Sequence, residues 1–296
     1  MLIGSRMSAV RNSSIVRAQP DVVVIGAMRA GTTTLQDILD QIEGVAVPTI
    51  KETNFFCGDD SETRSGWDWY GKLFDPAAEL RCDISPNYAK RSLYPQVARR
   101  IAAANPDAKI VFIARDPVER AVSQYAHSFH SGQSLPLPSE LVGTPEGDHI
   151  ISTSSYAYCL EPFRDHFGDQ LEILDFSDLV QTPEDFLRSF MTMAGIQADT
   201  SQVAMTAQNS SEDLARTPKW WGKLRESQLG DALRRRVPRD YMLRIKGTLA
   251  KSWTKQERRE VPKFSENDRQ RLIEALADDV ETFRKTYRKP FSDWCL

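Results

Sequence analysis

Short apolar runs alternate with amphipathic segments along most of the chain. Residues 22–25 are apolar, β-branched and unalternated, a pattern typical of a strand covered on both faces. Further strands of this kind are predicted over 109–114 and 171–176. Strands that alternate with helices predict an α/β fold with a central parallel sheet and right-handed crossovers. Apolar residues recur at helical spacing in the segments 32–39, 95–104, 118–129, 156–167, 183–194 and 266–288.

Length and composition narrow the class of protein. The chain has 296 residues, of which 41% are hydrophobic, and no run of about 20 apolar residues that would span a membrane. A net charge of −3 argues against a strongly basic nucleic-acid-binding protein. Residues 1–20 lack an apolar stretch of signal-peptide length, so we expect them to form a flexible tail and the protein to be cytoplasmic.

We expect a single domain over 21–296, with a helical C-terminal portion. The segment 132–149 is rich in Pro, Gly and Ser, which predicts a loop or lid. The segment 206–264 is irregular and basic and is the candidate for covering the acceptor or the cofactor. The sequence gives no indication of an oligomeric state.

Cysteines and histidines give no metal signature. Cys57, Cys82, Cys159 and Cys295 form no C-x-x-C pair, which argues against a zinc site and a disulfide scaffold. His127 and His130 can share one helix face, but they lack partners at metal-ligand spacing. We therefore expect no metal site.

A glycine-bounded turn follows the first strand. Gly26 and Gly31 are separated by four residues, the spacing of a P-loop, and a helix N-terminus follows them. Backbone N–H groups in such a turn can cradle an anion. The P-loop fingerprint would place a lysine at Thr32, whereas this chain carries its cation at Arg29. A tight strand–helix connection without a ligand is the alternative.

A second anion site is predicted after the strand 109–114. Arg115 follows that strand directly, and Ser123 lies on the next helix, for which Asp116 is the expected N-cap. An arginine with a nearby hydroxyl suits a phosphate, although a local salt bridge within 115–120 is an equal alternative. An ATPase would need an acidic residue at this strand end to hold Mg²⁺.

Several blocks, taken in order, resemble sulfotransferases that use 3′-phosphoadenosine 5′-phosphosulfate (PAPS). The resemblance is closest to the branch of bacterial enzymes and heparan sulfate sulfotransferases. Residues 24–35 are similar to the family's 5′-phosphosulfate loop, and 113–125 to its 3′-phosphate block. Between these two segments, the blocks 51–56, 66–70 and 83–88 are similar to further blocks of the family, in the same order.

The resemblance implies a P-loop-like, three-layer α/β/α fold, with PAPS as donor and 3′-phosphoadenosine 5′-phosphate (PAP) as product. It implies that Arg29 replaces a catalytic loop lysine and that Glu52 is the base, where the alternative is a surface carboxylate paired with Lys51. Asp83 is a second candidate base; otherwise it caps the turn at Ser85. The implied cofactor-binding residues are Arg29, Ala30, Gly31, Thr32, Thr33, Thr34, Arg115 and Ser123.

The chain departs from the heparan-type pattern in two further respects besides the loop. Ile84 stands where those enzymes favour a lysine, and their C-terminal cysteine pair is absent. Candidates for closing over the cofactor are Lys219, Lys223 and Lys246.

The leading hypothesis is sulfonate transfer to a hydroxyl, or an amine, of a small-molecule, lipid or carbohydrate acceptor. The alternatives are a P-loop kinase or NTPase, and a non-catalytic protein on a decayed sulfotransferase fold. No nucleic-acid partner is expected.

Overall fold

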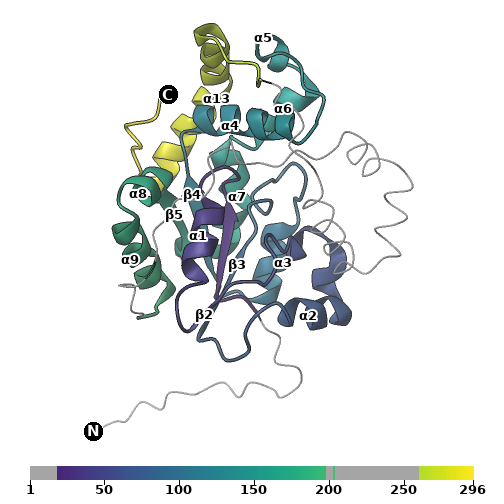
Figure 1. Cartoon of the computed structure of the whole chain (residues 1–296), viewed down its shortest axis with the longest axis vertical. Helices are drawn as coiled ribbons and strands as arrows, with labels where there is room; N and C mark the ends of the chain where they lie inside the picture. Colours follow the sequence, from purple (N-terminus) through teal and green to yellow (C-terminus); the bar gives the residue numbers. More distant parts are fainter. Residues whose placement is uncertain (1–18, 198–202, 204–259) are drawn as a thin grey trace.

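The structure is a computed structural model that describes residues 19–197, 203 and 260–296. A five-stranded parallel sheet forms its centre, in the order β2-β3-β1-β4-β5 (Figure 1). The strands are β1 (Val22–Gly26), β2 (Val45–Ala46), β3 (Leu80–Ile84), β4 (Lys109–Ala114) and β5 (Leu171–Asp175). The predicted strands are confirmed as β1, β4 and β5.

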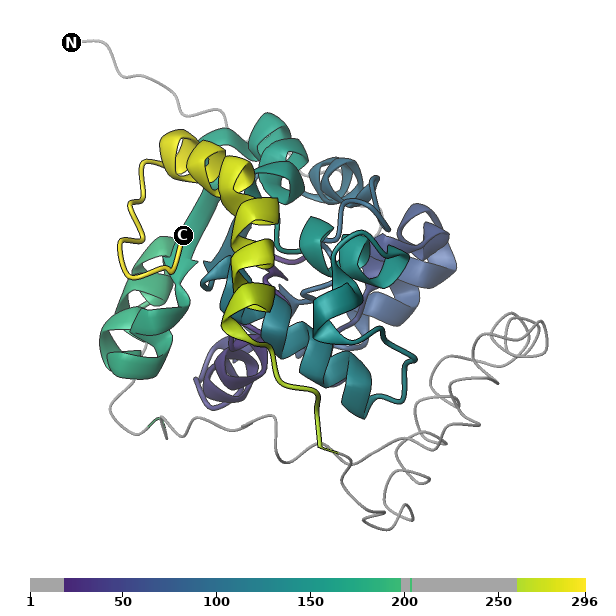
Figure 2. The same cartoon turned by 90° about the horizontal axis from the view of Figure 1, so that it is seen from above.

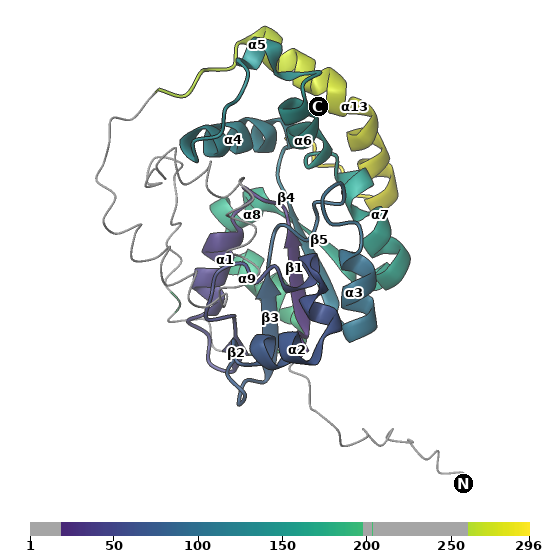
Figure 3. The same ribbon diagram turned by 90° about the vertical axis from the view of Figure 1, so that its right-hand side faces the viewer.

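Helices cover both faces of the sheet. Figure 3 shows α1, α8 and α9 on one side and α3, α7 and α13 on the other, with α4 beyond the carboxyl ends of the strands. This is the predicted three-layer α/β/α arrangement. The helices are α1 (Thr32–Leu39), α2 (Arg64–Gly71), α3 (Val97–Ala104), α4 (Pro117–His130), α5 (Pro138–Leu141), α6 (Pro145–Ser152), α7 (Tyr156–Phe167), α8 (Phe176–Gln181), α9 (Pro183–Ala194) and α13 (Glu266–Tyr287).

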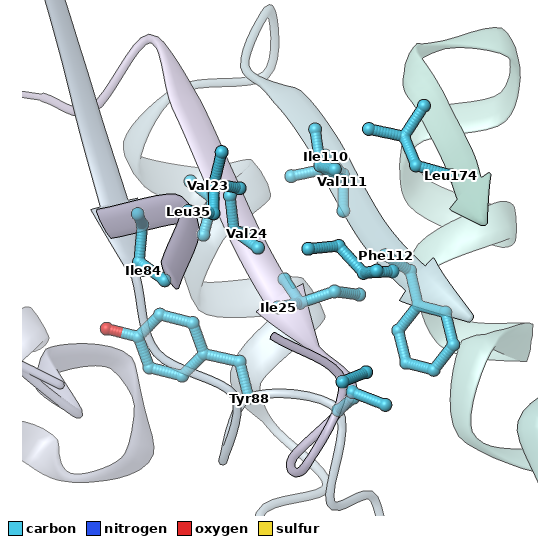
Figure 4. Packing of buried hydrophobic residues seen from close by; sticks show 14 of the residues in the cluster. Val23, Val24, Ile25, Leu35, Ile84, Tyr88, Ile110, Val111, Phe112 and Leu174 are labelled. Carbon is cyan, nitrogen blue, oxygen red and sulfur yellow. The ribbon is translucent and has the colours of Figure 1, made fainter. Parts of the chain in front are cut away.

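The core lies on both sides of β1 and β4. Side chains of Val23 and Val24 pack beside Ile110 and Val111, and Leu35 of α1 joins them (Figure 4). Every residue of β1 is buried, as expected for a central strand of a parallel sheet. In α9 the buried face consists of Phe186, Leu187, Phe190 and Met191, and Met193 is half-buried.

The segment 132–149 differs from the prediction of a loop or lid. Part of it forms α5 and the first half of α6. Both helices have a proline in their first turn, where the missing N–H costs nothing, and Thr144 caps α6 by accepting a hydrogen bond from the Gly147 N–H. The residues that suggested a loop therefore begin helices.

The C-terminal helix α13 packs on the face of the domain that carries α7. α13 packs against α7 and α4 (Figure 2). Asp279 of α13 accepts hydrogen bonds from the N–H groups of Ala157 and Tyr158 at the start of α7. Within the described parts of the chain, no helix combines the length and apolar character needed to cross a bilayer. The described residues leave out 1–18 of the expected tail over 1–20, and also most of 206–264 with Lys219, Lys223 and Lys246.

Candidate active site

The predicted site residues gather where the central strands end. β1 lies between β3 and β4, and it leads into the turn before α1. β4 leads into Arg115 and then α4. In open parallel sheets the crevice beyond the carboxyl ends of the strands is where ligands bind.

The turn between β1 and α1 has the shape of an anion cradle. Gly31 is the N-cap of α1 with φ 77°, and a Cβ atom there would lie 2.6 Å from Leu179 Cδ2. Arg29 also has a left-handed backbone, with φ 72°. In the described part of the chain, no side chain caps the N-terminus of α1, so its first-turn N–H groups are available to an anion.

The three threonines form the first turn of α1. Thr32 is buried, whereas Thr33 and Thr34 are half-buried. Ala30 is fully buried and its N–H donates to the carbonyl of Ala27, so it shapes the turn. These residues form the turn and the first helical turn of α1, and their contacts with a ligand stay predictions.

Two arginines and one serine from distant parts of the sequence meet beside this turn. Arg29 Nε donates to Ser123 Oγ at 3.1 Å, and Arg115 Nη1 donates to the carbonyl of Arg29 at 2.9 Å. Burial first, and then the charge of Arg115, lowers the pKa of Arg29. Among the described residues neither guanidinium contacts a carboxylate. Two adjacent cations without a counter-charge favour binding of an anion.

Arg115 is held in place by its neighbours. Its carbonyl accepts a hydrogen bond from the Tyr156 hydroxyl at 2.7 Å, and its guanidinium lies 5.0 Å from the ring centroid of Phe176. Asp116 caps α4 as predicted, since its Oδ1 accepts from the N–H groups of Val118 and Glu119. Local charge pairing involves Glu119, which bonds Arg269 rather than Arg115.

Glu52 lies in an unusual backbone turn. Its φ is 56°, and that of Asn54 is 49°, both in the left-handed region. Glu52 is half-buried and Lys51 is exposed, and the two form no ion pair in the described structure. The turn therefore presents the Glu52 carboxylate separately from Lys51.

Lys90 belongs to the site, although sequence reasoning missed it. Burial first, and then the charge of Arg120, lowers the pKa of Lys90 to about 8, while the nearby charge of Glu52 opposes the shift. Ile84, which stands where heparan-type enzymes favour lysine, is buried in the core. A lysine six positions after Ile84, just beyond the block 83–88, was the available signal.

His127 faces the same group of cations. Its Nδ1 atom is buried and has no hydrogen-bond partner among the described residues. Burial first, and then the charges of Arg29, Lys90 and Lys51, lowers its pKa to about 4. His127 lies one helical turn beyond Ser123, so this face of α4 contributes a neutral imidazole to a cationic site.

Asp83 is not placed to act as a base. It is fully buried and accepts hydrogen bonds from Tyr88 OH at 2.8 Å, Tyr70 OH at 2.9 Å, Ser85 Oγ at 3.0 Å and Thr53 Oγ1 at 3.0 Å. Burial raises its pKa, and these hydrogen bonds oppose the shift. An acceptor cannot reach this carboxylate, so the prediction of a second base is wrong. The alternative, in which Asp83 contacts the turn at Ser85, agrees with the structure. Among the described residues, no cluster of His, Cys, Asp and Glu could hold a metal ion.

Comparisons with known proteins show similarity to sulfotransferases. Residues 63–200 match the model of the sulfotransferase family. Heparan sulfate glucosamine 3-O-sulfotransferase 3A1 of Mus musculus is 27% identical over 188 residues, which cover 60% of this chain and 46% of that protein. The membrane-associated sulfotransferase kil1 of Dictyostelium discoideum is 33% identical over 114 residues, or 37% of this chain and 23% of that protein.

A solved structure supports the fold. The sulfotransferase from Alicyclobacillus acidocaldarius superposes with a TM-score of 0.63 at 21% identity, covering 93% of this chain and 98% of that one. The fold is thus the α/β fold of sulfotransferases, and residues 63–200 of the chain are similar to the sulfotransferase family. It spans about half or less of the length of the curated relatives it matches.

Proposed function

We propose that this protein transfers a sulfonate group from PAPS to a hydroxyl of a carbohydrate acceptor. One observation carries the proposal. Arg29 and Arg115 lie beside the uncapped N-terminus of α1, where Arg29 donates to Ser123 and Arg115 donates to the carbonyl of Arg29. Among the described residues neither arginine bonds a carboxylate. A nucleotide with phosphates at both its 5′ and 3′ positions matches two cations and a helix N-terminus.

Each end of the donor has residues suited to it. The turn from Gly26 to Thr34 would hold the 5′-phosphate through backbone N–H groups and threonine hydroxyls. Arg115 and Ser123 would hold the 3′-phosphate, since the Ser123 hydroxyl accepts from Arg29 and keeps its own proton for a phosphate oxygen. PAPS, when bound, supplies the sulfonate and a phosphate leaving group.

The chain's own residues would provide fixed charge and a base. Arg29 would neutralise the charge that develops on the departing phosphate, as in the analogous phosphoryl transfers. Glu52 would take the proton from the acceptor hydroxyl, a contribution of roughly 10²- to 10⁴-fold.

The names of the relatives favour a carbohydrate acceptor. The mouse relative is a heparan sulfate glucosamine 3-O-sulfotransferase, which directs attention to sugar hydroxyls. An amine is the second candidate acceptor, because the name of another relative, from Caenorhabditis briggsae, includes an N-sulfotransferase. The cytoplasmic location expected from the sequence stays a prediction.

The kinase alternative finds no support in the site. β4 is followed by Arg115, and Asp83, the last residue but one of β3, is enclosed by four hydroxyl groups. Neither strand end presents a carboxylate to a Mg²⁺-bound triphosphate.

A transfer assay tests the proposal. Sulfur-labelled PAPS is incubated with desulfated heparan oligosaccharides, simple sugars, phenols and amines, and the labelled products are separated. We expect label on a carbohydrate with the wild-type protein and none with Glu52→Gln, although that variant binds PAP with unchanged affinity. No transfer to any acceptor by a protein that binds PAP would refute the proposal.

A further inference from the structure

The buried carboxylate of Asp83 lies next to the segment that carries Glu52. It sits at the end of β3, and four hydroxyl groups donate to it, from Thr53, Tyr70, Ser85 and Tyr88. A buried carboxylate is stable only with such bonds, because an unpaired buried charge is costly. The arrangement keeps Asp83 away from any ligand, so its role must be exerted through its partners.

Three of these four hydroxyls also accept hydrogen bonds from consecutive backbone N–H groups. Ser85 Oγ accepts from Asn54 N at 3.2 Å, and Thr53 Oγ1 accepts from Phe55 N at 3.2 Å. Tyr88 OH accepts from Phe56 N at 3.4 Å. Each hydroxyl thus links one N–H of the segment 54–56 to the carboxylate.

The direction of these bonds depends on the charge of Asp83. A hydroxyl has a single proton, and an ionised carboxylate can only accept, so every hydroxyl points its proton at Asp83 and its lone pairs at the backbone. A protonated Asp83, or an asparagine, would present a donor to groups that already donate. At least one hydroxyl would then have to turn its own proton away from Asp83, so the bond that orients it toward the backbone would be lost.

The linked segment continues directly into Glu52. Glu52 and Asn54 are both in the left-handed region, which asparagine tolerates but which is unfavourable for Glu52 without outside support. Asn54 Nδ2 donates to the Glu52 carbonyl at 3.2 Å, and Asn87 Nδ2 donates to Asn54 Oδ1 at 3.0 Å. Thr53, between the two, is anchored by Asp83. The turn that presents Glu52 is therefore tied to the end of β3.

We propose that ionised Asp83 is a positioning residue for Glu52, acting through the hydroxyls of Thr53 and Ser85. The inference rests on the proposed function, in which Glu52 is the base. A loss of alignment at a reacting group by about 1 Å can lower the rate by about 10²-fold. Donor binding would be unaffected, because Arg29, Arg115 and Ser123 make no contact with the Asp83 network among the described residues.

The experiment compares variants that break the links with matched variants that keep them. Three variants each break a link: Asp83→Asn, Ser85→Ala and Thr53→Val. Thr53→Ser keeps the hydroxyl that Thr53→Val removes. Tyr70→Phe removes a bond to Asp83 that leads to no backbone N–H in the described structure. Three quantities are measured: amide hydrogen exchange at residues 54–56, turnover with the best acceptor from the transfer assay, and PAP affinity by calorimetry.

We expect the link-breaking variants to expose the amides of residues 54–56 to exchange. Their kcat should fall by about 10²-fold, while their affinity for PAP stays within about twofold of wild type, a change of under roughly 0.5 kcal/mol. Thr53→Ser should recover both protection and turnover, and Tyr70→Phe should lose much less of each than Ser85→Ala.

Two results would overturn the inference. One is an Asp83→Asn protein with wild-type exchange protection and turnover. The other is an equal loss of turnover in Tyr70→Phe and Ser85→Ala, which would indicate a merely structural network. If Asp83→Asn does not fold, the pair Thr53→Val and Thr53→Ser carries the test. A wild-type protein that does not bind PAP would instead contradict the proposed function, and exchange at residues 54–56 would still report on the links.

Discussion

Removing the Arg115 guanidinium should weaken binding of the donor's 3′-phosphate more than binding of its 5′-phosphate. Arg115 Nη1 bonds the carbonyl of Arg29, and the side chain has no carboxylate partner in the described structure. Arg115→Ala therefore removes a cation without releasing a buried anion. It also removes a support of the turn that precedes α1, so both ends of the donor should be affected, the 3′ end more strongly.

The magnitude follows from the kind of bond that is lost. Hydrogen bonds to charged groups contribute about 1.5–3 kcal/mol each. One such bond to a 3′-phosphate corresponds to an increase of roughly 10- to 150-fold in the Kd of PAP. Adenosine 5′-phosphate lacks the 3′ group, so its Kd should rise only through the loosened turn.

Calorimetric titration of both nucleotides provides the assay. The ratio of the two Kd values should change by at least about tenfold between wild type and Arg115→Ala, which is about 1.4 kcal/mol of coupling. Arg269→Ala is the control, since Arg269 pairs with Glu119 outside the site and is part-exposed. An unchanged ratio in Arg115→Ala would refute the assignment of the 3′-phosphate to Arg115.

Further predictions concern the base, the turn and acid stability. Glu52→Gln should abolish turnover with wild-type PAP affinity, measured by the transfer assay and calorimetry; residual turnover above a few per cent would exclude Glu52 as the base. Gly31→Ala should lower the free energy of unfolding by about 1–3 kcal/mol, because its Cβ would meet Leu179. In urea denaturation, Gly143→Ala, with φ 91° and open space around its Cβ, should cost less. Burial first, and then the charge of Arg29, lowers the pKa of His127 in the folded protein to about 4 from its ordinary value of 6.5. The unfolded state therefore binds more protons between these values, and stability should fall as the pH drops from 6.5 to 4. His127→Gln should reduce this slope, and an unchanged slope would contradict the assignment.

Much of the fold could be predicted from the sequence. The unalternated runs of β1 and β4 have no other stable arrangement than a sheet covered on both faces, and the Asp116-Pro117 pair fixes the start of α4. β2 escaped prediction because it has only two residues. α5 was missed because its proline suggests a break in a chain segment that contains few apolar residues.

The candidate site was predictable in its residues but not in its contacts. Arg29, Arg115 and Ser123 could each be named from the strand–turn–helix pattern, whereas the bond between Arg29 and Ser123 joins residues 94 positions apart. Asp83 looked like a base because carboxylates at strand ends often are exposed. Only the fold shows that hydroxyls from α2, from the 53–54 turn and from the residues after β3 enclose it.

Binding of PAP compared with that of Mg-ATP tests the central claim most directly. The account predicts that PAP binds tightly in the absence of metal, with a favourable enthalpy from charged hydrogen bonds, and that Mg-ATP binds weakly. Preference for Mg-ATP would contradict the sulfotransferase assignment of the site. Binding of neither nucleotide would contradict the claim that Arg29 and Arg115 form a functional phosphate site.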